Sequence, residues 1–437
     1  MKVLKSGSMA NLDRRSFNRL LGTAAAAGLV SSVGSSFAAA KGKTRARVVI
    51  IGGGAGGGTV AHLIRKNARK IDVTLVEPNS TYTSCFFSNQ YIGGFRSMES
   101  IQHNYDGLKK LGVNIVHDFA SSIDSEKKVV SLKDGEALPY DKLVLSPGVD
   151  MNYEAIEGYS EDVARIMPHA WETGDQTHAL RRQLLDMKDG GTVLISVPGN
   201  PYRCPSAPYE RATLIAHYLK HYKPASKLII LDTKSLFPRM ELFEEAWSGE
   251  YKGLVEWIPG DKHGGVVKVL ANEMSLVTRN GDKMKADVVN VIPPQKASMI
   301  AVRAGCTEGD WCPIVPDSFA SRLVKDVFVL GDAATARNMP KSASSAHSQA
   351  QIVANAIAAQ LTGKKMFPPR YRNTCWSLLA TNNAIKSGAS YVAGKDLVEQ
   401  RTSFKSDVKE DKEIRAGNFR ESLKWYDEIT ADIFAKG

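Results

Sequence analysis

The chain has 437 residues, of which 43% are apolar and 24% are charged, a composition typical of a globular protein with two or three domains. It contains no uninterrupted apolar stretch of about 18 residues, so we expect no membrane span in the mature protein. The formal net charge of +11 suits an acidic protein partner or an anionic substrate. Because Lys and Arg form no runs interleaved with aromatic residues, nucleic acid is not an expected partner.

The first 40 residues indicate an export signal. Arg14 and Arg15 form a twin-arginine motif, an apolar stretch covers 20–33, and small residues leading to Ala40 offer a cleavage site. An amphipathic N-terminal helix is the alternative. We predict a signal peptide over 1–40 and a periplasmic location reached in the folded state, which suits a protein that acquires its cofactor in the cytoplasm. Cleavage would remove five basic residues and one acidic residue and lower the net charge from +11 to about +7.

A strand, a glycine-rich turn and an acid follow over 47–77. Gly52 allows a tight turn, Gly54 lets the backbone approach a pyrophosphate, and Gly57 lets the next helix press onto the strand. Glu77 ends the next apolar run, where it can accept both hydroxyls of an adenosine ribose. A plain glycine-rich turn would not need that acid. This spacing predicts a dinucleotide site in a first segment over 41–157, closed by the apolar strand and turn of 140–148.

A second α/β unit is predicted over 158–298, with strands at 191–197 and 227–232 and a helix at 209–221. Its turn carries Pro198, Pro201 and Pro205 where a working nucleotide site would have glycines. Proline cannot give the close backbone approach that a pyrophosphate needs. We therefore predict that this unit keeps the nucleotide-binding fold and does not bind NAD(P)H.

The chain then returns to the first domain over 299–366. A buried strand at 326–330 ends in Gly331 and Asp332, where the aspartate can bond a ribityl hydroxyl of a flavin, and a helix follows from near Ser344. After Pro368 and Pro369 the composition changes, which predicts a C-terminal interface domain over 367–437. The predicted fold class is α/β, with two Rossmann-like dinucleotide-binding domains plus this C-terminal domain.

Five cysteines occur, at positions 85, 204, 306, 312 and 375. None are spaced as CxxC or CxxCH, so neither a zinc ribbon nor a covalent c-type haem is encoded, and no metal site is predicted. Cys306 and Cys312 lie in a polar, loop-like stretch and could pair with each other or stay reduced.

Several segments resemble one family, the flavoprotein subunit of flavocytochrome c sulfide dehydrogenase, over essentially the whole mature chain. The resemblance rests on the segments Ser84-Cys85-Phe86-Phe87-Ser88-Asn89, Arg203-Cys204-Pro205, Tyr209-Glu210-Arg211-Ala212, Val291-Ile292-Pro293-Pro294-Gln295, Gly331-Asp332-Ala333 and Asn373-Thr374-Cys375. It implies a glutathione-reductase-like fold, FAD as the cofactor and sulfide as the substrate. It also implies a heterodimer with a c-type cytochrome subunit that accepts the electrons. Phe86-Phe87 and a shorter, more charged tail depart from the family pattern.

The resemblance also implies roles for three cysteines. Cys85 would hold the 8α-methyl carbon of FAD in a thioether, and Cys204 and Cys375 would form a redox disulfide over the flavin. Glu210, six residues after Cys204, could carry protons if it is buried. The plainer alternatives are a small buried thiol for Cys85, a structural disulfide for the pair, and a first-turn glutamate favoured by its helix dipole for Glu210.

Two other functions compete with sulfide:cytochrome c oxidoreductase. A sulfide:quinone oxidoreductase would need an apolar quinone mouth and an amphipathic membrane anchor, and the charged segment 401–420 argues against that. An NAD(P)H-dependent FAD disulfide or ferredoxin reductase is disfavoured by the proline-rich second turn and by export away from nicotinamide pools.

Overall fold

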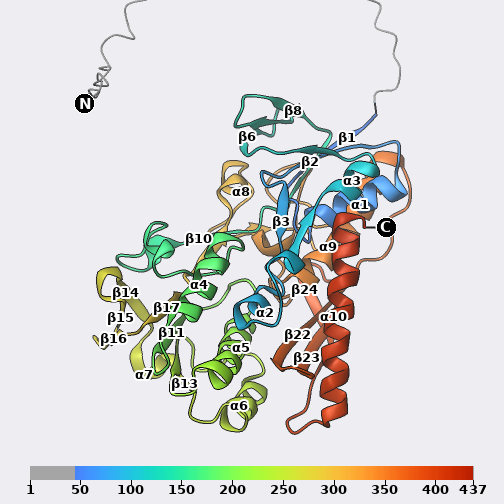
Figure 1. The fold of residues 1–437 in the computed structure, drawn as a ribbon. Coiled ribbons are helices and arrows are strands. Elements are labelled where there is room, and N and C mark those ends of the chain that lie inside the picture. Colours follow the sequence, from blue (N-terminus) through green and yellow to red (C-terminus); the bar gives the residue numbers. More distant parts are fainter. Residues whose placement is uncertain (1–44, 437) are drawn as a thin grey trace, which may run out of the picture. The chain divides into compact units, whose positions relative to one another are not determined.

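The computed structural model describes residues 45–436. The predicted signal peptide lies outside these residues. Two parallel sheets, each with helices packed on it, form the two halves of the fold, and a C-terminal segment of strands and one long helix runs beside them (Figure 1). The predicted α/β class with Rossmann-type sheets is confirmed. Within 45–436, no helix is long and apolar enough to cross a membrane.

The first sheet has five parallel strands in the order β20-β9-β1-β2-β5. Apart from β5 at the edge of the sheet, their sequences are short apolar runs with mostly buried side chains, as expected for parallel strands covered by helices. The bounds are β1 (Arg47–Ile51), β2 (Asp72–Val76), β5 (Asn114–Val116), β9 (Lys142–Leu145) and β20 (Val327–Val329). The sheet therefore joins strands from 47–145 to one from 327–329, as the returning segment predicts.

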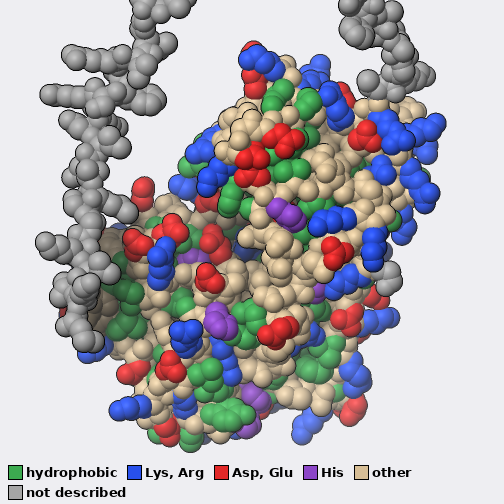
Figure 2. All heavy atoms as spheres, turned by 45° about the horizontal axis from the view of Figure 1, so that its top comes forward, with side chains coloured by type: hydrophobic (Ala, Val, Ile, Leu, Met, Phe, Trp, Pro, Cys, Tyr) green, Lys and Arg blue, Asp and Glu red, His purple; other side chains and the backbone are tan. Residues whose placement is uncertain are grey.

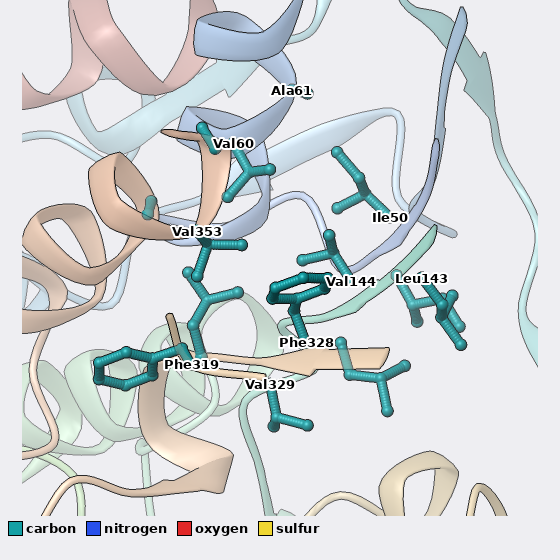
Figure 3. Close-up of a cluster of buried hydrophobic side chains, with 14 of the residues drawn as sticks. Ile50, Val60, Ala61, Leu143, Val144, Phe319, Phe328, Val329 and Val353 are labelled. Carbon is teal, nitrogen blue, oxygen red and sulfur yellow. The ribbon is translucent and has the colours of Figure 1, made fainter. Parts of the chain in front are cut away.

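Helices α1 (Gly57–Asn67) and α9 (Ala343–Thr362) pack against this sheet and against each other. Figure 3 shows their contribution to the core, with Val60 and Val353 facing Phe328 and Val144 of the strands. All four side chains are fully or almost fully buried. This core fixes the carboxyl ends of β1, β2 and β20, where the glycine turn, Glu77 and Asp332 lie. Helix α3 (Asp106–Lys110) and the ribbon β6 (Ala120–Asp124), β7 (Val129–Leu132), β8 (Ala137–Pro139) extend this half.

The second sheet has four parallel strands in the order β13-β12-β11-β17. Its strands are β11 (Thr192–Val197), β12 (Lys227–Asp232), β13 (Val255–Ile258) and β17 (Val288–Val291), and its helices are α4 (Asp175–Asp186), α5 (Ala207–Tyr222) and α6 (Met240–Ser248). A three-stranded ribbon adjoins it, formed by β14 (Val266–Leu270), β15 (Ser275–Thr278) and β16 (Lys283–Lys285). The antiparallel pair β10 (Val149–Met151) and β18 (Gln295–Ala297) connects the two halves. The exact domain boundaries stay a prediction.

The C-terminal segment contains β22 (Arg370–Ala380), β23 (Asn383–Ala393), β24 (Val398–Lys405) and α10 (Lys412–Phe434). The sequence predicts an interface domain here with a charged segment over 401–420, and it does not indicate the individual strands or the helix. In the structure, α10 contacts β22, β23 and α1, and its residues Ile429, Ile433 and Phe434 belong to the main core. Tyr426, Ile429 and Ile433 thus lie three to four positions apart on one buried face of α10. This segment places Cys375 and Trp425 against the two Rossmann-type halves.

Candidate functional site

The glycine-rich turn between β1 and α1 forms one wall of a large cleft. Gly52 has φ +97°, and a Cβ there would lie 2.3 Å from the carbonyl oxygen of Ser146. A Cβ on Gly57 would lie 1.9 Å from the carbonyl oxygen of Gly52. Both positions therefore require glycine, as predicted. The cleft has a volume of about 800 Å³ and is lined by Gly52, Gly54, Glu77, Cys85, Gly331 and Asp332 among others.

Glu77 lies at the carboxyl end of β2 in this cleft and is only 9% exposed. Its Oε2 accepts a hydrogen bond from the Gly53 amide at 2.9 Å, and its Oε1 accepts from the Asn79 amide at 3.1 Å. These bonds hold the carboxylate beside the turn. The acid thus occupies the place in which a nucleotide fold binds ribose hydroxyls.

Asp332 lies at the opposite end of the cleft, directly after Gly331 at φ +75°. Its Oδ2 accepts a hydrogen bond from Arg203 Nε at 2.7 Å. Its Oδ1 is buried and has no hydrogen-bond partner among the described residues. A buried carboxylate oxygen without a donor is costly, so this oxygen is suited to a hydroxyl of a bound ligand.

The residues of the cleft fit FAD. The N-terminus of α1 can take the pyrophosphate, Glu77 an adenosine ribose, and the orphan oxygen of Asp332 a ribityl hydroxyl. The N-terminal residues of α9, Ala343 and Ala346, also line the cleft and follow Ser342, whose Oγ caps the helix by accepting from the Ser345 amide at 3.2 Å.

A second, smaller cavity of about 90 Å³ contains the cysteines. Cys204 and Cys375 both line it, although 171 positions separate them, and Cys85 lines this cavity as well as the large cleft. All three are free thiols in this structure. Cys204 lies just before α5 and Cys375 lies on β22, so the fold brings together a turn and a strand from different parts of the chain.

The backbone around this cavity is strained. Cys204 has φ +83° and Phe87 has φ +71°, and both residues line the cavity. A left-handed conformation costs a non-glycine residue about 1 kcal/mol or more, so the surrounding structure must hold it in place.

Burial raises the pKa of the Cys204 thiol, with further increases from Cys375 and Glu210, while the guanidinium of Arg239 acts in the opposite direction.

Glu210 belongs to the same cavity. Its Oε2 accepts a hydrogen bond from Asn89 Nδ2 and its Oε1 accepts from the Leu378 amide, both at 2.9 Å. The carboxyl thus bonds groups of α2 (Ser88–Gly93) and β22 and not the amides of its own first turn. Burial raises the pKa of Glu210, and the two hydrogen bonds oppose this only in part. A buried carboxyl of this kind is suited to accept and release a proton.

The structure also reveals two functional candidates that the sequence reasoning did not assign. Arg203 donates from Nη1 to the carbonyl oxygen of Trp171 at 2.8 Å, in addition to its ion pair with Asp332. Arg239 donates from Nη1 to the carbonyl oxygen of Cys375 at 3.5 Å and from Nη2 to Ser206 Oγ, so it joins the segments of both cavity cysteines. Nothing in the sequence pattern pairs these arginines with their distant partners.

Cys306 and Cys312 lie outside the cavity. Both are fully buried in the core of the first half, although their sequence context suggested a polar loop. Burial raises the pKa of Cys306 to about 11 and that of Cys312 to about 12. Both remain free thiols. Within 45–436, no cluster of His, Cys, Asp and Glu side chains is placed to hold a metal ion.

The second Rossmann-type sheet has an acid at the end of β12, the position at which a nucleotide fold binds ribose. This residue, Asp232, is fully buried and already bonded on both oxygens. Tyr209 Oη and Trp257 Nε1 donate to Oδ2, and Lys234 donates to Oδ1 from Nζ at 2.7 Å. Both carboxylate oxygens of Asp232 are therefore already used within the protein. Together with the proline-rich turn, this disfavours binding of a nicotinamide nucleotide to the second sheet.

Three family models match the chain. "Sulfide dehydrogenase [flavocytochrome c] flavoprotein chain, central" matches 177–293, "Flavocytochrome c sulphide dehydrogenase, flavin-binding" matches 367–434, and "Pyridine nucleotide-disulphide oxidoreductase" matches 46–190. The third model covers the glycine-rich turn and Glu77, and the second covers Cys375.

Similar proteins and structures agree with these matches. The mitochondrial sulfide:quinone oxidoreductase of Dictyostelium discoideum is 27% identical over 346 residues, which cover 74% of this chain and 73% of that protein. The sulfide dehydrogenase [flavocytochrome c] flavoprotein chain of Chlorobaculum thiosulfatiphilum is 51% identical over 43 residues, 10% of this chain and 90% of that sequence. The X-ray structure of the sulfide:quinone oxidoreductase from Aquifex aeolicus superposes with a TM-score of 0.70 at 17% identity, covering 90% of this chain and 93% of that one.

We predict that NADH neither binds this protein appreciably nor reduces its flavin, because Pro198, Pro201 and Pro205 occupy the turn and Asp232 is already bonded. Anaerobic mixing of the protein with NADH, followed at the flavin absorption band, tests this. Sulfide is the positive control. Rapid bleaching by NADH would show that the second sheet still binds a nicotinamide nucleotide.

Proposed function

We propose that this chain is a sulfide-oxidising flavoprotein of the kind that includes flavocytochrome c sulfide dehydrogenase and sulfide:quinone oxidoreductase. It oxidises sulfide at Cys204 and Cys375 beside FAD and passes the electrons to a separate c-type cytochrome subunit. One observation carries the proposal. Two cysteines from distant segments line one small cavity, and that cavity shares Cys85 and Arg203 with the cleft that fits FAD.

The first step is thiol–disulfide exchange. The structure holds Cys204 and Cys375 as free thiols. In the proposed resting enzyme they are joined in a disulfide, and hydrosulfide attacks one of the two sulfurs. The S–S bond breaks, a new S–S bond forms, and the products are one cysteine persulfide and one cysteine thiolate. A second hydrosulfide then displaces the persulfide sulfur as HSS⁻, and the two cysteine sulfurs re-form their bond. FAD, when bound, would take up the two electrons released as that bond re-forms and would pass them on singly. The chain's own task is to hold the two sulfurs in a small space that excludes most water.

Glu210 supplies the base. Hydrogen sulfide must lose a proton to become the nucleophile, and the carboxylate lines the cavity that contains both cysteines. Its hydrogen bonds to Asn89 and Leu378 fix its position whether or not it carries a proton. Because burial raises the pKa of Glu210, its ionised form is a stronger base than an exposed glutamate.

A c-type cytochrome is the proposed acceptor because the C-terminal segment matches the flavocytochrome c flavin-binding model over 367–434 and builds the wall of the cysteine cavity with Trp376 and Trp425. The apolar residues near the end of α10 are buried against α1 and the core, so they are not free to enter a lipid surface. A quinone is the second candidate acceptor. The aromatic side chains of Phe87, Trp376 and Trp425 around the cavity would suit a quinone ring, and several relatives are sulfide:quinone oxidoreductases.

The remaining elements of the proposal concern FAD attachment and location. Cys85 lies in the FAD cleft, and we propose that it forms a thioether with the 8α carbon of the cofactor. The twin-arginine motif supports export of the folded flavoprotein to the periplasm, where the cytochrome subunit would join it as a heterodimer.

Replacing Cys204 or Cys375 with alanine should leave FAD bound and slow flavin reduction by sulfide by about two orders of magnitude or more, because the exchange step is lost. Stopped-flow bleaching of the flavin measures this rate. Cys306→Ala, a buried thiol outside the cavity, is the matched control and should keep the wild-type rate. Reduction at wild-type rates in both cavity variants would mean that sulfide reacts with the flavin directly. Steady-state assays of the same proteins with cytochrome c and with a short-chain quinone distinguish the two acceptors.

Glu210→Gln should reduce the rate of sulfide-dependent flavin reduction by about 10²-fold. The pH profile should change as well. In the wild type the rate should fall as the pH drops through the raised pKa of Glu210, because the protonated carboxyl is no longer a base. This fall should be absent in the variant, in which nothing titrates at that position. Glu244→Gln, an exposed residue of α6, is the control. An unchanged pH profile in Glu210→Gln would rule out the assigned role.

Replacing Arg14 and Arg15 with lysine should leave the unprocessed precursor in the cytoplasm, because the twin-arginine pair is the recognised element of this signal. Cell fractionation followed by immunoblotting measures the distribution. Secretion at the wild-type level would mean that the protein leaves by another route.

A further inference from the structure

Four residues line both the large cleft and the cysteine cavity: Cys85, Arg203, Ser342 and Ala343. Of these, only Cys85 and Arg203 carry ionisable side chains. Neither cavity cysteine that performs the proposed exchange chemistry reaches the large cleft. The ionisable groups at which the large cleft and the cysteine cavity meet are therefore one thiol and one guanidinium.

Three hydrogen bonds fix the position of Arg203. Its amide donates to Gln295 Oε1 at 3.0 Å, its Nε donates to Asp332 Oδ2 at 2.7 Å, and its Nη1 donates to the carbonyl oxygen of Trp171 at 2.8 Å. None of the hydrogen bonds formed within 45–436 uses Nη2. This group lies beside Gly148, where an added Cβ would come within 3.3 Å of it, and Gly148 lines the large cleft. The guanidinium is thus fixed with a free donor group toward the cofactor's side.

Each of the three residues that bind Arg203 has a second polar atom that is buried and has no partner among the described residues. These atoms are Asp332 Oδ1, Gln295 Nε2 and Trp171 Nε1. Unsatisfied buried polar groups are rare in folded proteins. Asp332 lines the large cleft, Trp171 lines the cysteine cavity and Gln295 lines neither, so Asp332 Oδ1 is the atom of the three that is placed to meet a ligand of the large cleft.

We propose that Arg203 is a positioning residue that eases loss of the Cys85 thiol proton during attachment to the flavin, and that Asp332 limits this effect. The inference rests on the proposed covalent attachment of FAD to Cys85. It assigns Arg203 to the attachment of the cofactor and not to the exchange reaction, which has its own cation in Arg239.

The charges around Cys85 support this assignment. Burial raises the pKa of the Cys85 thiol, Arg203 lowers it and Asp332 raises it. The other titratable groups facing Cys85 are Tyr82 and Tyr426, from β3 (Thr81–Thr83) and α10, and Cys204. Tyr82, Tyr426 and Cys204 are neutral or negative, so among these groups Arg203 carries the positive charge that favours ionisation of Cys85. A thiolate, and not a thiol, is the nucleophile in reactions of cysteine.

The attachment balances as follows. The sulfur of Cys85 forms a bond to the 8α carbon, which loses one hydrogen. That hydrogen and the thiol hydrogen, together with two electrons, remain on the isoalloxazine ring as the reduced cofactor. Dioxygen then takes two electrons and two protons to give hydrogen peroxide and restores the oxidised, attached flavin. Arg203 acts on the first part by favouring loss of the thiol proton.

The test uses full-length protein produced in riboflavin-limited cells, to which FAD is added. At each time point, acid precipitation separates attached flavin from released flavin. Arg203→Gln should bind FAD but attach it at least about 10-fold more slowly than the wild type, and Arg203→Lys should keep most of the rate because it keeps the charge. Arg239→Gln is the matched control and should attach FAD at the wild-type rate. Attachment by Arg203→Gln at the wild-type rate would overturn the inference.

A second measurement separates failure of the inference from failure of covalent attachment. In flavin-free protein, the rate at which iodoacetamide alkylates Cys85 is followed by mass spectrometry across pH. Arg203→Gln should shift this profile to higher pH, and Asp332→Asn should shift it to lower pH. If wild-type protein releases all its flavin in acid, as Cys85→Ser must, covalent attachment is wrong. The alkylation profiles then still decide whether Arg203 controls Cys85, and profiles that coincide in all three proteins would refute it.

Discussion

The cysteine cavity depends on the burial of one guanidinium. Arg211 is only 1% exposed, and a charged group so deep in a protein must have its donors satisfied. It donates to Asn89 Oδ1, to Asn290 Oδ1 and to the carbonyl oxygens of His169 and Ala170, and its guanidinium lies over the Trp171 ring at 4.8 Å. These contacts tie α5 to α2, to β17 and to the loop before α4. Asn89 in turn donates to Glu210, so the network that neutralises Arg211 also fixes the carboxyl beside the two cysteines.

A second arginine, Arg203, explains how a nucleotide-binding unit contributes to the thiol site. The strand–turn–helix unit of the second half is retained, with β11 and β12 paired in parallel register. Its turn, however, folds onto the first half through the ion pair between Arg203 and Asp332. Cys204 occupies the strained, left-handed position next to that anchor, so its side chain enters the cysteine cavity while that of Arg203 reaches the large cleft. The fold thus presents a sulfur from the turn at which a dinucleotide-binding fold approaches a pyrophosphate.

Much of the first half could be predicted from sequence because local sterics and spacing determine it. Gly52 and Gly57 are required where the backbone itself approaches, and Glu77 follows at the distance that one βαβ unit sets. Apolar runs of the right length also predicted the second sheet, the helix after Cys204 and the strand that ends in Gly331 and Asp332. They did not predict the last helix, because its buried apolar residues are few and its other positions are charged. The pairing of Arg203 with Asp332 and of Arg239 with Cys375 also could not be predicted, because residues 129 and 136 positions apart meet only through tertiary packing. Cys306 and Cys312 lie in the core although their neighbours are polar, since local polarity does not determine burial.

The cavity also constrains the order of charge movements in the proposed reaction. Glu210 raises the pKa of Cys204, and burial raises the pKa of both, so the two groups disfavour being ionised together. If hydrogen sulfide enters as a neutral molecule, Glu210 takes its proton, and the exchange then releases one cysteine thiolate. The cavity holds one negative charge before this step, on Glu210, and one afterwards, on sulfur. Arg239 lowers the pKa of both groups and can therefore offset the charge in either position. Arg211 also lowers the pKa of Glu210, so fixed cations offset one anion at a time, and a second anion need not enter a space of about 90 Å³.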